Sequence, residues 1–259
     1  MNDWQAVGDG GVLVRSRWIY NCYLLPDADS ASPLVVDVGV PSHGVAVAGW
    51  LGASGVESAT ILATHLHSDH VGGLPAFEEH AGAGAVAGAD VVLPDRARSY
   101  AEGEAPRSPG AREVARIWPV LRSQPFSFGA LVESARGPKV GYGLHPFALP
   151  VSAPTWIADG EPVPGAPGWV AMVAPGHTDD STTYYHAASR TLAAGDAILT
   201  VGGRAWFNPE YVDGAVSAET EARFRSLRVD VLLPGHGRPL VGRDLLASAL
   251  GHDERPSRR

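Results

Sequence analysis

Cysteine is nearly absent from this chain of 259 residues, since Cys22 is the only one. A single cysteine excludes an internal disulfide and a zinc site built on cysteine ligands, and it suits a reducing compartment. The sequence also contains no apolar run of 18 residues, and Met1–Trp4 lack the charged and apolar regions that begin a signal peptide. These absences predict a cytoplasmic protein that has no contact with a membrane.

Positive charge is also scarce. Lys and Arg number 20 against 28 Asp and Glu, which leaves a formal net charge of -8. Proteins that bind nucleic acid rely on clustered Lys and Arg to neutralise phosphates, so nucleic acid is not an expected partner. Hydrophobic residues make up 45% and charged residues 19% of the chain, which is typical of a folded protein. We expect one domain over residues 1–259, and no feature specifies an oligomeric state.

Strands and helices alternate in the first half of the predicted fold. The segment from 94 to about 143 is helical but irregular, and it is interpreted as an insertion of helices and loops laid over the sheet edge. The other elements expected in this half are two strands over 11–25, strands at 33–38, 58–63 and 91–93, a helix at about 42–52, and a helix that begins near Gly72.

A second block of strands is expected to begin near Pro146. Two packed sheets flanked by helices satisfy the order of elements in the whole chain. The elements expected in this block are strands at 155–161, 169–173, 183–186, 191–194 and 229–233, and helices at 215–227 and about 243–250.

Residue types that bind metals gather after one predicted strand. The stretch Thr64–Gly73 places His65, His67, Asp69 and His70 within six positions, directly after an apolar run. Alternate residues of an extended segment point the same way, so the first two histidines face one point while the other two residues follow as the chain turns into a helix. The carboxyl ends of strands are where α/β sheets bind their ligands. The stretch therefore predicts a metal site at a sheet edge.

Three further candidate ligands follow apolar strands in the second half, each in a turn that contains glycine: His177, Asp196 and His236. Imidazole and carboxylate donors suit zinc, iron, manganese or nickel better than calcium or magnesium. Seven donors exceed the four ligands that one zinc ion usually takes. Two ions about 3.5 to 4 Å apart would use all seven, with one carboxylate bridging the ions.

The motif His-x-His-x-Asp-His, followed in order by Pro-Gly-His-Thr, Gly-Asp and Pro-Gly-His-Gly, resembles the metallo-β-lactamase-fold hydrolase superfamily. The similarity spans residues 12 to about 241. The resemblance implies an α/β fold, a four-layer αββα sandwich of two mixed β-sheets flanked by helices. It also implies two divalent metal ions, expected to be Zn²⁺, with iron or manganese as alternatives. The implied ligands are His65, His67 and His177 for one ion, Asp69, His70 and His236 for the other, and Asp196 as the bridge.

The resemblance implies that a hydroxide between the two ions attacks the carbonyl carbon of a small ester, thioester or lactone, with Asp69 and Asp196 as the catalytic carboxylates. Asp196 argues against a β-lactam, because β-lactamases of this fold usually lack the bridging aspartate. The short segment after His236 argues against a glutathione thioester, because glyoxalase II carries a longer carboxyl-terminal extension. An iron-dependent oxidoreductase or dioxygenase on the same ligand set is the alternative function.

Four residues that follow the bridging aspartate are candidate substrate contacts. The segment from Gly202 to Tyr211 is aromatic, and we expect it to be a loop that forms one wall of the substrate site. In the alternative interpretation its aromatic rings pack beneath that loop. The candidates are Arg204, which would pair with a carboxylate, and Trp206, Phe207 and Tyr211.

Three aspartates next to the motifs have roles that the sequence leaves open. Asp37 either orients a ligand histidine or satisfies backbone amides at a strand end. Asp179 and Asp180 stand where the family commonly has Pro-Gly, and they are expected to cap their own turn, with a role near the metals as the alternative.

Overall fold

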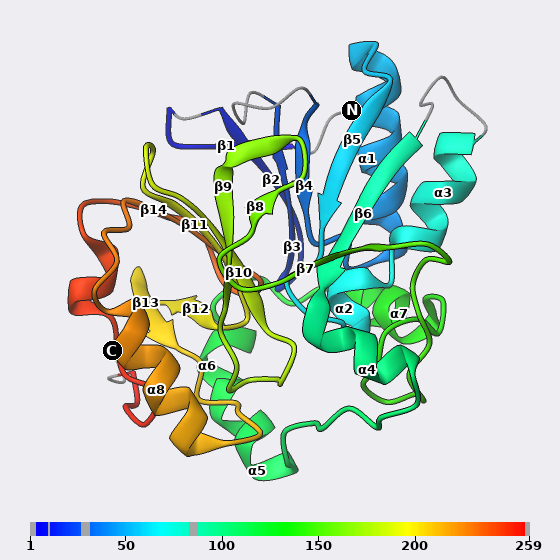
Figure 1. The fold of residues 1–259 in the computed structure, drawn as a ribbon. Coiled ribbons are helices and arrows are strands. Elements are labelled where there is room, and N and C mark those ends of the chain that lie inside the picture. The colour runs from blue at the N-terminus through cyan, green and yellow to red at the C-terminus, as the bar shows by residue number, and fades with distance from the viewer. Residues whose placement is uncertain (1–3, 10, 27–31, 83–87, 257–259) are drawn as a thin grey trace.

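The computed structural model describes residues 4–9, 11–26, 32–82 and 88–256. The two ends of the range 1–259 lie outside the described residues, and the grouping of the chain into one domain stays a prediction. The described residues form two large sheets that face each other (Figure 1), together with a separate two-stranded hairpin.

The first sheet has seven strands that follow one another in chain order. The first three pairings are antiparallel and the last three are parallel, so the sheet is mixed. Its strands are β1 (Gln5–Val7), β2 (Val12–Arg17), β3 (Tyr20–Leu25), β4 (Leu34–Val36), β5 (Ser58–Leu62), β6 (Gly88–Pro94) and β7 (Thr155–Ile157).

The second sheet has six strands and is also mixed, because β11 and β14 are parallel while the other neighbours are antiparallel. Across the sheet the strands are β15 (Leu240–Val241), β14 (Val231–Pro234), β11 (Thr191–Gly195), β10 (Thr182–His186), β9 (Ala166–Val173) and β8 (Pro162–Val163). The separate hairpin consists of β12 (Ile198–Val201) and β13 (Arg204–Phe207).

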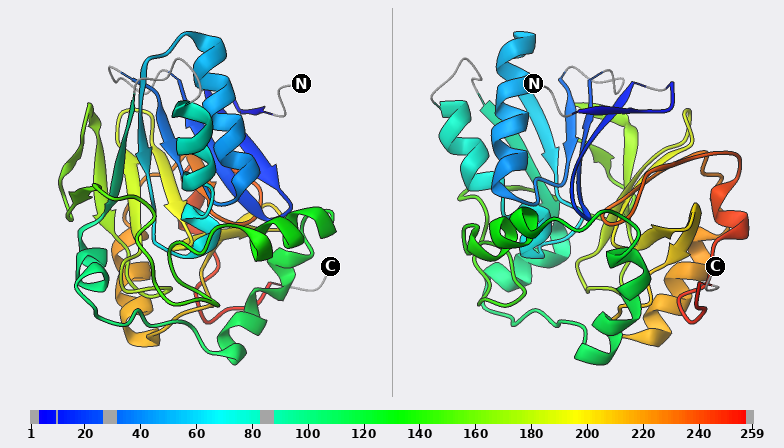
Figure 2. Two further views of the ribbon diagram at one scale, coloured as in Figure 1. Left: turned by 90° about the vertical axis from the view of Figure 1, so that its right-hand side faces the viewer. Right: turned by 180° about the vertical axis from the view of Figure 1, so that it is seen from behind.

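Helices cover the outer faces of both sheets, as Figures 1 and 2 show. Helices α1 (Pro41–Ser54) and α3 (Leu74–Gly82) pack on the first sheet, and α8 (Gly214–Phe224) lies outside the second. The inner faces of the sheets share one apolar core, to which Tyr23 and Leu62 belong from the first sheet and Tyr184 and Leu233 from the second. The expected four-layer αββα sandwich is therefore confirmed.

Alternation along the strands explains why both faces of the first sheet are buried. In β3 every residue is buried. Cys22 and Leu24 pack against the helices, whereas Tyr23 and Leu25 enter the core between the sheets. A strand that is buried on both faces reads as a continuous apolar run rather than as an alternating one. This burial also confirms that Cys22 is a small core side chain, and burial raises the pKa of its thiol.

Three expectations about elements were wrong. The strand at 155–161 ends at Ile157, and it joins the first sheet rather than the second because β7 pairs in parallel with β6. The segment at 204–207 is a strand rather than a loop, since the positive φ angles of Gly202 and Gly203 allow the tight turn of the β12–β13 hairpin. The last predicted helix, at about 243–250, is only a short 3-10 helix at Leu245–Ser248. Asp244, which precedes it, has a left-handed backbone conformation.

Short helices connect β6 to β7 across the region expected to be an insertion. In Figure 1 they lie in the lower part of the molecule, at the end where α2 (Ser68–Val71) begins. None of the described helices has the length and hydrophobicity needed to cross a lipid bilayer. The connecting elements are η1 (Asp95–Ala97), α4 (Arg98–Ala101), α5 (Ala111–Val114), η2 (Ala115–Ile117), α6 (Trp118–Leu121) and α7 (Phe128–Arg136).

Candidate metal centre

Four turns at the ends of strands carry the seven candidate ligands. The first turn follows β5 and leads into α2, while the other three follow β9, β11 and β14 in the second sheet. Each turn is fixed to a buried strand, so the position of each donor is set by the sheets rather than by a free loop. In the last of these turns Gly235 is required, because a Cβ atom there would collide with the Asp196 carboxylate and the His70 ring.

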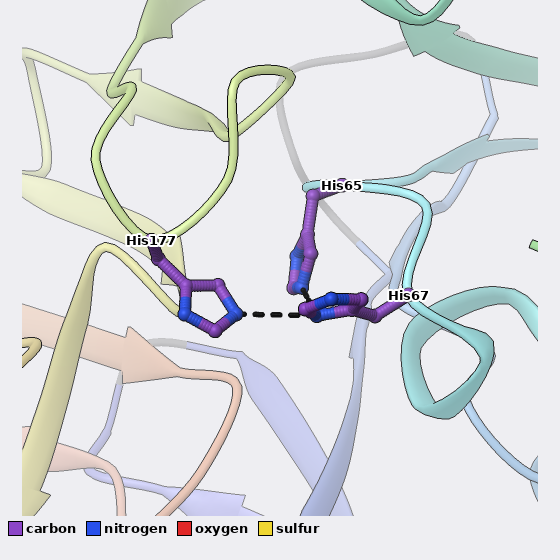
Figure 3. Close-up of side chains that lie close together, drawn as sticks. All are labelled: His65, His67 and His177. Carbon is purple, nitrogen blue, oxygen red and sulfur yellow. Dashed lines mark hydrogen bonds between the residues drawn. The ribbon is translucent and has the colours of Figure 1, made fainter. Parts of the chain in front are cut away.

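Three histidines from the two sheets meet in one group (Figure 3). His65 and His67 come from the turn after β5, and His177 reaches toward them from the turn after β9. The Nδ1 atom of His67 lies 2.9 Å from Nε2 of His65 and 3.2 Å from Nε2 of His177. The three ligand atoms all lie within 4.8 Å of one another. We call this group the triple-histidine site.

A second group is formed by Asp69, His70 and His236, whose ligand atoms also lie within 4.8 Å of one another. The carboxylate of Asp196 lies between the two groups. Its Oδ2 atom is 3.5 Å from Nε2 of His177 and 3.2 Å from Nε2 of His236, and its Oδ1 atom is 3.5 Å from Nε2 of His70. We call Asp69, His70 and His236 the mixed site. The structure thus brings all seven predicted ligands together.

The second ring nitrogen of several histidines is held by a fixed partner. Nδ1 of His177 donates to the carbonyl of Glu210 at 2.8 Å, and Nδ1 of His236 donates to the carbonyl of Ile19 at 3.1 Å. A carbonyl can only accept, so each neutral ring keeps its lone pair on Nε2, the atom that faces the cluster. Partners of this kind orient metal-binding histidines in proteins.

Asp37 orients the ring of His70 and also satisfies a backbone amide, so it has both of the roles that the sequence left open. Its Oδ2 lies 2.8 Å from Nδ1 of His70 and accepts the hydroxyl of Thr64 at 2.8 Å, while its Oδ1 accepts the Thr64 amide. Asp37 is 2% exposed and has a left-handed backbone with φ 57°. Thr64 was missed in the sequence, because a threonine beside a histidine motif carries no pattern of its own.

The electrostatics of the cluster follow from burial and from the two carboxylates. Burial lowers the pKa of His67 to about 3, with the neighbouring His177 adding to the effect. Burial also opposes the charged form of His70, but Asp196 and Asp37 outweigh it and raise its pKa to about 10. Burial likewise opposes the charged form of His236, but the carboxylates of Asp196 and Asp69 outweigh it and raise the pKa of this ring. Without an ion, the mixed site therefore holds protons between its carboxylates.

Two buried atoms show that the donor set fits metal ions. Among the described residues, Nε2 of His70 and Oδ1 of Asp196 are buried and have no hydrogen-bond partner. The two atoms face each other at 3.5 Å, which is too long for a good hydrogen bond, so a cation bound by both would satisfy them. Imidazole nitrogens and carboxylate oxygens at these separations are the donors that zinc, iron and manganese take.

Two of the four predicted substrate contacts are buried, whereas the other two reach the surface. Trp206 is 1% exposed and donates its indole N–H to the carbonyl of Gly251, and Phe207 is 2% exposed in the apolar cluster that contains Phe224. The two neighbouring rings point to opposite faces of β13, and each face is covered by a separate apolar cluster, so both rings are packed as the alternative interpretation held. Arg204 is exposed and donates to the carbonyl of Ser248. Tyr211 lines a cavity of about 1150 Å³, where Arg116 packs over its ring at 5.1 Å.

A second cavity of about 400 Å³ lies close to the triple-histidine site. It is lined by Tyr100, Tyr142 and Phe147 from the region that connects β6 to β7. Tyr142 lines this cavity and also packs on the ring of His67, with the two ring centroids 4.6 Å apart.

Comparisons with known proteins identify relatives of similar sequence and fold. The Probable metallo-hydrolase YflN of Bacillus subtilis (strain 168) is 26% identical over 263 residues, which cover 92% of this chain and 87% of that protein. The crystal structure of TTHA1623 in a di-iron-bound form has a TM-score of 0.55 at 18% identity and covers 88% of this chain and 92% of that one. FIM-1 from Pseudomonas aeruginosa, in a mono-zinc form, has a TM-score of 0.52 at 13% identity and covers 94% of this chain and 90% of that one.

At these identities the solved structures are evidence of a shared fold alone. The family itself is shown by the model of the metallo-beta-lactamase superfamily, which matches residues 15–236. That range contains all seven candidate ligands and most of both sheets. The chain belongs to the metallo-beta-lactamase superfamily.

Proposed function

We propose that the protein is a dinuclear metal-dependent hydrolase that cleaves a small ester, thioester or lactone. The observation that carries this proposal is the position of the Asp196 carboxylate, which is within 3.5 Å of histidines in both the triple-histidine and the mixed site. The name of the relative from Bacillus subtilis, a probable metallo-hydrolase, supports the same reaction class. The proposed location is cytoplasmic, and the proposed partner is a small carbonyl compound rather than nucleic acid or a membrane.

The residues that would hold the ions have distinct tasks. His65, His67 and His177 would hold one ion, Asp69, His70 and His236 the other, and Asp196 both. Two divalent ions in this site, expected to be Zn²⁺, would lower the pKa of a water molecule and stabilise the oxyanion that forms when a carbonyl is attacked. The six ligands other than Asp69 would only hold the ions in position while the reaction proceeds.

Asp69 is the side chain best placed to move a proton. Its side chain is 25% exposed, whereas those of His70, Asp196 and His236 are 2%, 3% and 6% exposed. Asp69 is therefore more accessible to solvent than these three side chains. Its carboxylate would accept a proton from the attacking water and return it to the leaving oxygen or sulfur.

Hydrolysis of a simple aryl ester is the first test of the proposed function. We expect turnover of an aryl acetate, a thioester or a γ-lactone to survive dialysis, to fall at least about 100-fold after treatment with a chelator, and to return when Zn²⁺ is added. The readouts are release of the aryl alcohol and the content of zinc, iron and manganese in the purified protein. Full activity in protein from which all metal has been stripped would contradict the proposal.

The protonation of the mixed site predicts how metal binding depends on pH. The raised pKa values of His70, at about 10, and of His236 mean that both rings hold protons at neutral pH until an ion displaces them. Metal binding should therefore release up to two protons, and affinity should fall about tenfold per pH unit for each proton as the solution becomes more acidic. Calorimetric titration of Zn²⁺ at pH 6 to 8, in buffers with different ionisation enthalpies, measures the protons. Affinity that is constant over this range would contradict the prediction.

An iron-dependent oxidoreductase is the second candidate function. The histidine and carboxylate donors accept iron as well as zinc, and TTHA1623 has been solved with two iron ions. Expression without added metal separates the two candidates. Iron at two equivalents with a visible absorption band and no ester turnover would favour the oxidoreductase, whereas colourless zinc protein with ester turnover favours the hydrolase.

A further inference from the structure

The side chain of Asp180 links the two backbone segments that carry the triple-histidine site, which are the turn with His65 and His67 and the turn with His177. Asp180 is 1% exposed. Its Oδ2 accepts the backbone N–H of Leu66 at 2.8 Å, and its Oδ1 accepts the hydroxyl of Tyr142 at 2.6 Å. The sequence predicted that Asp180 caps its own turn. Its carboxylate does interact with Thr178 in that turn, but its two hydrogen bonds at 2.8 and 2.6 Å reach segments more than 30 positions away, and Ser181 also closes the turn by accepting the amide of Thr178.

The contact of Asp180 with Leu66 ties together all three ligands of the triple-histidine site. Leu66 stands between His65 and His67, so its amide belongs to the turn that presents both rings. Asp180 follows His177 by three residues and holds that turn from the opposite sheet. One buried carboxylate thus sets the distance between the two backbone segments from which these three histidines project.

Tyr142 holds the same turn from a second side. Its amide donates to the carbonyl of Leu66 at 2.8 Å, and its carbonyl accepts the amide of Ser68 at 2.9 Å. Its ring packs on the ring of His67, and its hydroxyl is the second donor to Asp180. The backbone, the ring and the hydroxyl of Tyr142 therefore all limit the freedom of His67.

The mixed site has different supports. His70 is held by Asp37, and His236 is held by the carbonyl of Ile19. Within the described residues, no hydrogen bond or ion pair joins Asp180 to the side chains of these two histidines. Loss of Asp180 would therefore loosen one site and leave the supports of the other in place.

We propose that Asp180, together with Tyr142, is a positioning residue that sets the metal affinity of the triple-histidine site separately from that of the mixed site. This inference rests on the proposed function, because it assumes that both sites hold ions. Both oxygens of Asp180 must accept, since each faces a donor. An asparagine at this position loses the negative charge and can hold Tyr142 only by donating its N–H₂ group to the hydroxyl, so it weakens both contacts at unchanged volume.

The test compares Zn²⁺ binding by metal-free wild-type protein and by Asp180→Asn, using competition with a chromophoric chelator. For the wild type we expect two equivalents. In Asp180→Asn we expect one of the two affinities to fall about 10- to 100-fold, which is the effect of removing a partner that orients a ligand, while the other affinity stays within about twofold. The cobalt-substituted protein identifies the affected site, because the visible absorption of the weaker site should change shape.

Asp179→Asn is the matched control. Asp179 is the preceding residue, and its carboxylate pairs with the exposed side chain of Arg107 rather than with the ligand turn. This variant should bind both ions as the wild type does. Tyr142→Phe removes only the hydroxyl and should shift the same affinity in the same direction by a smaller factor, which keeps the test valid if Asp180→Asn folds poorly.

Wild-type affinities in both Asp180→Asn and Tyr142→Phe would overturn the inference while leaving the proposed function intact. Equal weakening of both ions would also overturn it, because that result indicates a general loss of stability. A wild-type protein that binds no second ion would refute the dinuclear proposal and the inference together. Selective loss of one affinity, with an unchanged circular dichroism spectrum, is the supporting result.

Discussion

Asp196→Ala should reduce ester turnover by at least about 100-fold and the metal content from two ions to one at most. Removing an orienting partner of a ligand already costs about 10- to 100-fold in affinity or activity, and Asp196 contacts both sites directly. The variant should still fold, because His70 and His236 can release their protons once the carboxylate that raises their pKa values is gone. The measurements are metal content, kcat and thermal unfolding of the metal-free protein.

Two further variants make the Asp196 result specific. Asp196→Asn keeps the volume and one acceptor but loses the charge, so it should resemble the alanine variant in activity. Asp159→Ala removes an exposed carboxylate that pairs with Arg223 far from the ligands, and it should retain both ions. An Asp196→Ala protein that kept two tightly bound ions would show that this carboxylate does not bridge them.

Asp37→Ala should destabilise the metal-free protein by about 3–5 kcal/mol, the range found when one partner of a buried ion pair is removed. The aspartate is buried and accepts from the amide and hydroxyl of Thr64, and it faces Nδ1 of His70, whose pKa it helps to raise. Its loss leaves these groups without a partner inside the protein. Urea unfolding monitored by tryptophan fluorescence gives the free energy of unfolding.

Asp37→Asn separates stability from metal binding. The amide side chain can still accept from the Thr64 amide, but its N–H₂ group would donate to Nδ1 of His70. That donation places the ring proton on Nε2, the atom that faces the metal site. We expect a smaller loss of stability than in Asp37→Ala together with loss of the ion from the mixed site. Equal effects of both substitutions on metal binding and stability would contradict this account.

Much of the fold and all seven candidate ligands follow from local patterns in the sequence. The strand β5 and the turn after it are adjacent in the chain, so the apolar run and the histidine cluster can be interpreted together. His177, Asp196 and His236 each stand in a glycine-bearing turn after a buried strand, and the order of these motifs matches the family. The structure brings these segments to one edge because the strands that carry them lie in two packed sheets.

What the sequence did not predict depends on contacts between distant segments. Trp206 and Phe207 look like a binding wall in the sequence, yet both faces of their hairpin are covered and both rings are buried. Asp180 looks like a local cap, yet its partners lie 114 and 38 positions away. The role of Thr64 depends on Asp37, which accepts its hydroxyl and lies 27 positions away in the chain. In each case the deciding partner is set by tertiary packing, which periodicity and spacing do not encode.

The division of the ligands between β5 and the second sheet also fixes the order of events during synthesis. The first four donors leave the ribosome as a group, but Asp196 and His236 follow more than a hundred residues later. A growing chain that stops before β14 lacks the final donor and the strand that carries it. The complete set of donors is thus available only after β14 has been made, and without metal the protons on His70 and His236 would balance the buried carboxylates beside them.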